Sequence, residues 1–136
     1  MRNYLNVLIV LISINTFSQN LECCNNIEEV KKVIQGDWKL IGETKNVIYR
    51  FSFNNNKGFI EVLEELNLPP KALVNHHADL IIDEHTLVNI KSKNGRFFIE
   101  LISMYYQISE QIFVLNDEKF VYGKGQFEHV FIRDKG

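Results

Sequence analysis

The residue types best suited to metal chemistry in this chain are four histidines and one aspartate. His76, His77 and Asp79 are nearly consecutive, His85 follows soon after, and His129 lies close to the C-terminus. Imidazole and carboxylate groups are ligands that zinc accepts, and one histidine could also hold haem. Adjacent side chains of a strand point to opposite faces, so His76 and His77 could share an ion only from an irregular loop. We therefore favour a solvated loop with no metal and no cofactor, and metal binding is the alternative.

Other catalytic patterns find little support in the sequence. No Gly-x-Ser-x-Gly sequence is present, and Ser92, Ser103 and Ser109 have no predictable histidine partner for nucleophilic attack. The glutamates between residues 61 and 65 could include an acid–base pair. Carboxylates are rarely buried unless they are paired, however, so a solvated acidic strand end is expected. The chain is predicted not to be an enzyme.

The N-terminus has the pattern of a secretory signal peptide. Arg2 precedes an apolar run from Leu5 to Ile14, which is too short to span a bilayer, and Thr16 and Ser18 are small residues suited to cleavage after Ser18. We expect a signal peptide over 1–18, one domain over 19–136, and a secreted or periplasmic location without a membrane span. The net charge of −2 implies no basic face for nucleic acid.

Cys23 and Cys24 are the only cysteines of the chain. A lipid-anchored cysteine is possible but disfavoured, because Glu22 is a poor match to the small residue that precedes such a site. Adjacent cysteines are also expected to pair poorly. A disulfide prefers Cα atoms about 5.5 Å apart, whereas a trans peptide holds the Cα atoms of neighbouring residues about 3.8 Å apart. An intermolecular bridge and free thiols are the remaining expectations, and the oligomeric state is left open.

A short amphipathic helix is predicted between Asn26 and Gly36. Asn26 is a favourable N-cap, glutamates occupy the first turn, and Gly36 can adopt the left-handed conformation that ends a helix. The apolar residues recur at three- and four-residue spacing, at Ile27, Val30, Val33 and Ile34. This stripe must cover other apolar surface, so we expect the helix to plug one end of the fold.

After Gly36 the apolar period changes to two, which predicts a long series of strands. The expected segments are 38–43, 47–53, 59–66, 80–82, 85–93, 96–105, 111–115, 120–122 and 127–133. Asn94-Gly95 is a strong hairpin signal, because both residues tolerate the positive φ of a two-residue turn. It predicts the pairs Lys93 with Arg96, Ser92 with Phe97, Ile90 with Ile99 and Val88 with Leu101.

Short strands joined by short turns predict an all-β fold. Closure removes the edges that so apolar a sheet would otherwise expose, so an antiparallel up-and-down barrel of eight strands is the simplest arrangement. An open sheet that cradles the helix, as in cystatin-like or NTF2-like folds, is the structural alternative. Pairing of the first strand with the last would decide between them.

Three residues carry a resemblance to a known family. The sequence Gly36-Asp37-Trp38 begins the strand series and Arg133 ends it. This pattern resembles the Gly-x-Trp start and the closing arginine of lipocalin-like barrels. The resemblance implies that Trp38 lies at the closed end of a barrel and that Arg133 packs across it as a structural latch.

The same resemblance implies a container for a small molecule. The leading hypothesis is a lipocalin-like protein that binds a small hydrophobic ligand inside its barrel. An interaction module with a solid core, acting through its surface as an inhibitor or envelope accessory, is the alternative. The residues expected to face the ligand form an inner aromatic row, which comprises Tyr49, Phe51, Phe53, Phe97, Tyr105, Phe113, Tyr122 and Phe131.

Overall fold

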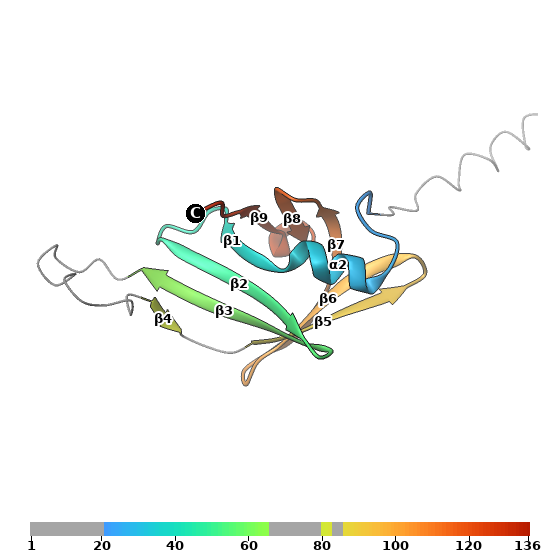
Figure 1. Ribbon diagram of the computed structural model, residues 1–136, viewed down its shortest axis with the longest axis horizontal. Helices are drawn as coiled ribbons and strands as arrows, with labels where there is room; N and C mark the ends of the chain where they lie inside the picture. Colours follow the sequence, from blue (N-terminus) through green and yellow to red (C-terminus); the bar gives the residue numbers. More distant parts are fainter. Residues whose placement is uncertain (1–20, 66–79, 83–85) are drawn as a thin grey trace, which may run out of the picture.

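The computed structural model describes residues 21–65, 80–82 and 86–136. The predicted signal peptide lies outside the described residues, and so do His76, His77, Asp79 and His85. The described part comprises one α-helix, nine strands and a short 3-10 turn, labelled as in Figure 1. Their bounds are α2 Ile27–Ile34, β1 Gly36–Leu40, β2 Val47–Asn54, β3 Lys57–Glu65, β4 Leu80–Ile82, β5 Thr86–Lys93, β6 Arg96–Ile102, β7 Gln107–Leu115, β8 Lys119–Tyr122, η3 Gly125–Phe127 and β9 His129–Arg133.

The strands close into a barrel. β1 pairs antiparallel with β2 on one side and with β9 on the other, so the first and last strands are neighbours. β4 and β5 pair with β3 at residues 63–65 and 58–60, and together they occupy one of eight positions around the barrel. The predicted antiparallel up-and-down barrel of eight strands is confirmed. The alternative of an open sheet around the helix is wrong.

Helix α2 forms where its predicted cap and apolar stripe lie. The side chain of Asn26 accepts a hydrogen bond from the Glu29 amide at 2.9 Å, and the Glu29 carboxylate accepts one from the Asn25 amide at 2.6 Å. These bonds pair two amides near a helix start that would otherwise lack partners. Val30 and Ile34 are fully buried, and α2 contacts β5 and β7. The helix therefore plugs one end of the barrel, and in Figure 1 it lies between β1 and β7.

The two ends of the barrel are named for what they carry. The helix end holds α2 and the turns that join β2 to β3, β5 to β6 and β7 to β8. The turns that join β1 to β2, β6 to β7 and β8 to β9 lie at the opposite end. We call this the tyrosine end, because it carries all the described tyrosines, which are Tyr49, Tyr105, Tyr106 and Tyr122.

Trp38 and Arg133 join α2 to the sheet. They lie opposite each other in the β1–β9 ladder, and the Arg133 Cζ is 3.9 Å from the centroid of the Trp38 ring. The Trp38 Nε1 donates a hydrogen bond to the Ile34 carbonyl at 2.6 Å, and Nη1 and Nη2 of Arg133 donate to the carbonyls of Gln35 and Val33. Carbonyls at the end of a helix have no partners inside it. The pair therefore caps α2 as well as stacking.

Gly36 is required by the same contact. Its φ is +124°, and a Cβ atom at this position would lie 2.6 Å from the Arg133 Nη1. A side chain would therefore be strained in the backbone and would also push the guanidinium away from the helix carbonyls. The three residues that carry the family resemblance thus form one structural unit.

The Asn94-Gly95 hairpin has the predicted register. Asn94 and Gly95 have φ of 53° and 74°, as a tight hairpin turn requires. The four predicted pairs are all present, namely Val88 with Leu101, Ile90 with Ile99, Ser92 with Phe97 and Lys93 with Arg96.

The expected extension of β6 through Tyr105 is wrong. β6 ends at Ile102, and a turn follows in which the Ser103 amide donates to the Tyr106 carbonyl at 2.9 Å. The Ser103 hydroxyl accepts hydrogen bonds from the Tyr105 and Tyr106 amides at 3.1 and 3.2 Å. The serine hydroxyl thus satisfies two backbone amides in a turn, so these amides do not need a partner strand. Consequently β7 starts at Gln107, earlier than expected, and Tyr105 is 79% exposed.

Phe113 lies outside the barrel, contrary to the expected inner row. The β7–β8 ladder pairs Ile112 with Tyr122 but Val114 with Val121, so its register shifts at Phe113. A β-bulge adds one residue to a strand and changes which side chains face inward. Ile112 is accordingly buried inside, whereas Phe113 lines a hollow on the outer face.

Cys23 and Cys24 are bonded to each other, so both expectations for these cysteines are wrong. Their Cα atoms are 3.7 Å apart, and no cysteine is free. Neighbouring side chains point apart in an extended strand. Here the segment is a turn instead, in which the Cys24 amide donates to the Leu21 carbonyl at 3.3 Å. Cys24 is buried against the hydrophobic core.

Candidate functional site

Side chains fill the interior at the helix end. The Phe120 ring contacts the rings of Trp38 and Phe51 edge-on, with centroids 5.8 and 5.7 Å apart. Such contacts are the favoured geometry of packed aromatic cores. The largest side chains with less than 2% exposure are Trp38, Phe51, Phe120, Ile34, Ile99, Ile112, Val30 and Val88.

The tyrosine end contains a cavity. Its volume is about 250 Å³, and side chains from eight of the nine described strands surround it. The lining residues are Leu40, Tyr49, Ile60, Val62, Thr86, Leu101, Tyr106, Ile108, Tyr122, His129 and Phe131. None of them is a lysine, an arginine or a carboxylate.

Aromatic rings form one side of this cavity. Tyr122 faces His129 across the β8–β9 ladder, and their rings stack with centroids 4.8 Å apart and planes 16° apart. Phe131 stacks on Tyr122 at 5.8 Å and meets Tyr49 edge-on at 5.4 Å. Aliphatic side chains from β3, β6 and β7 form much of the remaining lining. The cavity therefore has one aromatic side and one aliphatic side.

The apolar lining also contains polar side-chain atoms. Tyr122 and Thr86, which each carry a hydroxyl group, are only 4% and 6% exposed. The Tyr49 hydroxyl donates a long hydrogen bond to the Glu43 carboxylate at 3.4 Å. The Nδ1 of His129 lies 2.8 Å from the Phe127 carbonyl oxygen. A carbonyl only accepts hydrogen bonds, so Nδ1 carries a proton and Nε2 is the acceptor of the neutral ring.

Burial and nearby carboxylates control the ionisation of the tyrosines. Burial is the main cause that raises the pKa of Tyr122, and the phenols of Tyr106 and Tyr49 and the carboxylate of Glu110 add to it. Burial also raises the pKa of Tyr49, with the charge and hydrogen bond of Glu43 as further causes. Removing a phenol from water disfavours its charged form. Both tyrosines are therefore neutral hydroxyl groups at physiological pH.

The predicted inner row divides into four groups. Tyr49, Tyr122 and Phe131 line the cavity. Phe51 and Phe97 are buried in the core, and Phe53 is half-buried against it. As described above, Tyr105 is exposed in a turn and Phe113 lies on the outer face.

Sequence reasoning did not anticipate most of the remaining lining. Thr86 and Tyr106 stand at strand ends, and a period of two indicates the face of a residue but not its distance from the barrel end. Leu101 could have been found, because the Asn94-Gly95 register places it on the inner face. His129 was considered only as a metal ligand.

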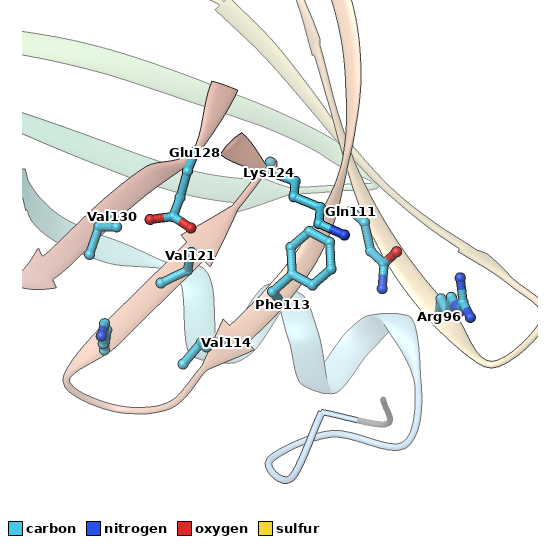
Figure 2. A pocket seen from close by; sticks show the side chains of 10 residues that line it. Arg96, Gln111, Phe113, Val114, Val121, Lys124, Glu128 and Val130 are labelled. Carbon is cyan, nitrogen blue, oxygen red and sulfur yellow. The ribbon is translucent and has the colours of Figure 1, made fainter. Parts of the chain in front are cut away.

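A larger hollow of about 710 Å³ lies on the outer face of β7, β8 and β9. Figure 2 shows valines from these three strands, Val114, Val121 and Val130, with Phe113 beside them and Lys124 and Glu128 above. Apart from Arg96, the lining comes from one face of the sheet and the turns beside it. Ligand sites enclose most of a small molecule, so the interior cavity is the better candidate despite its smaller volume.

Metal binding gains no support from the described residues. His129 is the only described histidine of the candidate set, and its Nδ1 is engaged by a backbone carbonyl. Within residues 21–65, 80–82 and 86–136, no three histidine, cysteine, aspartate or glutamate side chains are grouped to hold an ion.

No protein-family model, curated protein or solved structure matches this chain. In the part of the chain that the structure describes, no helix is long and apolar enough to cross a membrane.

Proposed function

We propose that this chain is a lipocalin-like protein that binds one small, mainly apolar molecule in the cavity at the tyrosine end. The observation that carries the proposal is the contrast within one barrel between a filled helix end and a 250 Å³ cavity beneath the opposite turns. A uniformly packed core would leave no such space. The tryptophan and arginine at the filled end support the family assignment.

The volume sets the size of the ligand. A dry cavity of about 150 Å³ accepts benzene, so 250 Å³ accommodates on the order of ten non-hydrogen atoms. Typical ligand pockets have volumes of about 300 Å³ or more, so this cavity lies just below the usual range. A single aromatic ring with a short substituent fits this space better than a long fatty acyl chain.

The expected location is outside the cytoplasm. The pattern of residues 1–18 supports export, and the disulfide between Cys23 and Cys24 is compatible with an oxidising compartment. A carrier or scavenger of small molecules in the periplasm or the medium is consistent with both features. Catalysis forms no part of the proposal.

The proposal can be tested with a small apolar dye whose emission rises in apolar surroundings. Trp38 is a poor reporter, because it is fully buried at the helix end and does not line the cavity. The protein should bind the dye saturably with a stoichiometry of one. Native mass spectrometry of the freshly purified protein should show whether a molecule co-purifies.

Two substitutions on β7 identify the site. Ile108 lines the cavity and Val114 lines the outer hollow. Ile108→Trp should fill the cavity and abolish dye binding, whereas Val114→Trp should leave it unchanged. Thermal melts of both variants confirm that they remain folded. Saturable binding that survives Ile108→Trp would contradict the proposal.

The outer hollow supports a second candidate function, an interaction module that acts through its surface. Its floor is apolar, and Val114 and Ile132 on this face are 38% and 40% exposed. Loss of dye binding in Val114→Trp alone would favour this surface over the cavity.

A further inference from the structure

Two hydroxyl groups in the cavity have no hydrogen-bond partner among the described residues. The Tyr122 and Thr86 side chains are more than nine-tenths buried and line the cavity, and neither hydroxyl has a hydrogen-bond partner among the described residues. Within that part of the chain, no completely enclosed polar side-chain atom is unpaired. Both hydroxyls are therefore accessible from the cavity. A purely hydrocarbon ligand would displace water from them and leave them unpaired, which is unfavourable.

His129 adds a third group of complementary character. Its Nδ1 is used by the Phe127 carbonyl, which leaves Nε2 as an acceptor on a ring that lines the cavity. The phenol of Tyr122 can donate, and the hydroxyl of Thr86 can donate or accept. A ligand group that both donates and accepts hydrogen bonds would satisfy this set best.

The charges around the cavity further limit the class of ligand. The lining contains no lysine or arginine to balance a ligand carboxylate. The carboxylate of Glu43 is bonded to Tyr49, and the charge of Glu110 acts on Tyr122. A carboxylate ligand would thus be desolvated beside groups of its own sign, which is costly. The lining also offers no carboxylate as a direct partner for an ammonium group.

We propose that the ligand is a small alcohol or phenol, with an apolar body of on the order of ten non-hydrogen atoms and one uncharged hydroxyl held by Tyr122. Thr86 and the Nε2 of His129 are the further hydrogen-bonding partners of that hydroxyl. This inference rests on the proposed function, because it names the ligand class of the same cavity.

A set of four probes with one shape isolates the polar group. The probes are 3-phenyl-1-propanol, propylbenzene, 3-phenylpropionate and 3-phenylpropylamine, measured by displacement of the apolar dye at neutral pH. One net hydrogen bond favours the alcohol over propylbenzene by about three- to tenfold. The carboxylate and the amine should each bind at least about tenfold more weakly than the alcohol, because each buries a charge without a partner.

Variants link the preference to the named side chains. Tyr122→Phe and Thr86→Val each remove a hydroxyl and preserve the approximate shape. Tyr122→Phe should weaken binding of the alcohol by about three- to tenfold and leave propylbenzene unchanged or slightly tighter. Tyr105→Phe is the matched control, because Tyr105 belongs to the same end but is 79% exposed and does not line the cavity.

The outcomes separate the two proposals. Equal affinity for the alcohol and propylbenzene, or tightest binding of the carboxylate or amine, would overturn the ligand class and leave a small-molecule carrier standing. An alcohol preference that Tyr122→Phe does not reduce would also overturn it. Failure of the dye and all four probes to bind would overturn the proposed function and this inference together.

Discussion

The two ends of this barrel use aromatic residues differently. At the helix end Trp38, Phe51 and Phe120 pack against one another and under α2, and each is less than 2% exposed. At the tyrosine end aromatic rings surround a cavity instead, and three of them, those of Tyr49, Tyr106 and Tyr122, carry hydroxyl groups. Phenylalanine offers only packing, whereas tyrosine adds a polar group that requires a partner when buried. We therefore expect the helix end to contribute most of the stability, and the proposed ligand site lies at the tyrosine end.

The strongest test of this comparison is Trp38→Ala. Trp38 is fully buried and its indole nitrogen holds the Ile34 carbonyl, so its loss should lower the free energy of unfolding by about 3–5 kcal/mol. Tyr49→Ala at the opposite end removes a half-buried ring beside an existing cavity and should cost less than about 2 kcal/mol. Denaturant melts of the two variants measure both quantities. Equal losses would contradict the division of roles.

A second test concerns the contact between Arg133 and Trp38. Arg133→Ala removes the stacking and leaves the helix carbonyls without donors, so we expect a loss of about 2–3 kcal/mol. Residues in contact couple by about 0.5–3 kcal/mol, so a double-mutant cycle with Trp38→Ala should be non-additive. Arg133→Lys is a useful control, because it keeps the charge but loses the planar fork. Additive losses would show that the two residues act independently.

The parts of the fold that follow from local chemistry could be predicted from sequence. Asn94-Gly95 determines the β5–β6 register through its positive φ angles, and the pattern around Gly36, Trp38 and Arg133 correctly indicated that β1 and β9 would meet. These features depend on few residues, each with a narrow range of conformations.

The cavity could not be predicted in the same way. The bulge at Phe113 depends on how β7 and β8 fit together. The turn at Ser103 occupies residues whose apolar alternation is equally compatible with a longer strand. An empty space also depends on the volumes of all the surrounding side chains, which a period of two does not encode. The candidate site was therefore anticipated only in Tyr49, Tyr122 and Phe131.

A third test uses alkaline pH to probe the tyrosine end. Burial raises the pKa of Tyr122, so the unfolded chain releases this proton first as the pH increases. Stability is full below the ordinary tyrosine pKa of about 10 and should fall above it, by about 1.4 kcal/mol per pH unit for one fully protected group. Tyr122→Phe should remove this part of the loss, while Tyr105→Phe should unfold as the unmodified protein does. Identical alkaline melts for all three proteins would contradict the burial of the Tyr122 side chain.

The smallest expected effect concerns the outside of the helix end, where Asp37 on β1 accepts hydrogen bonds from the Arg50 guanidinium on β2 at 2.7 and 2.9 Å. The hydrogen bond from Arg50 is the main cause that lowers the pKa of Asp37. A lowered pKa stabilises the fold above the ordinary aspartate pKa of about 4, and this contribution disappears as the pH falls through the folded value. Because both side chains are partly exposed, Asp37→Asn should cost only about 0.2–1 kcal/mol at pH 7.

The difference between Asp37→Asn and the unmodified protein should therefore vanish in strong acid, as acid melts at several pH values would show. Glu118→Gln at the same end is the control, because Glu118 and its partner Lys135 are about three-quarters exposed. A loss at pH 7 as large as that of Trp38→Ala would mean that surface charge, rather than the aromatic interior, secures the helix end. A loss that persists unchanged in strong acid would show that the Asp37 carboxylate contributes through something other than its charge.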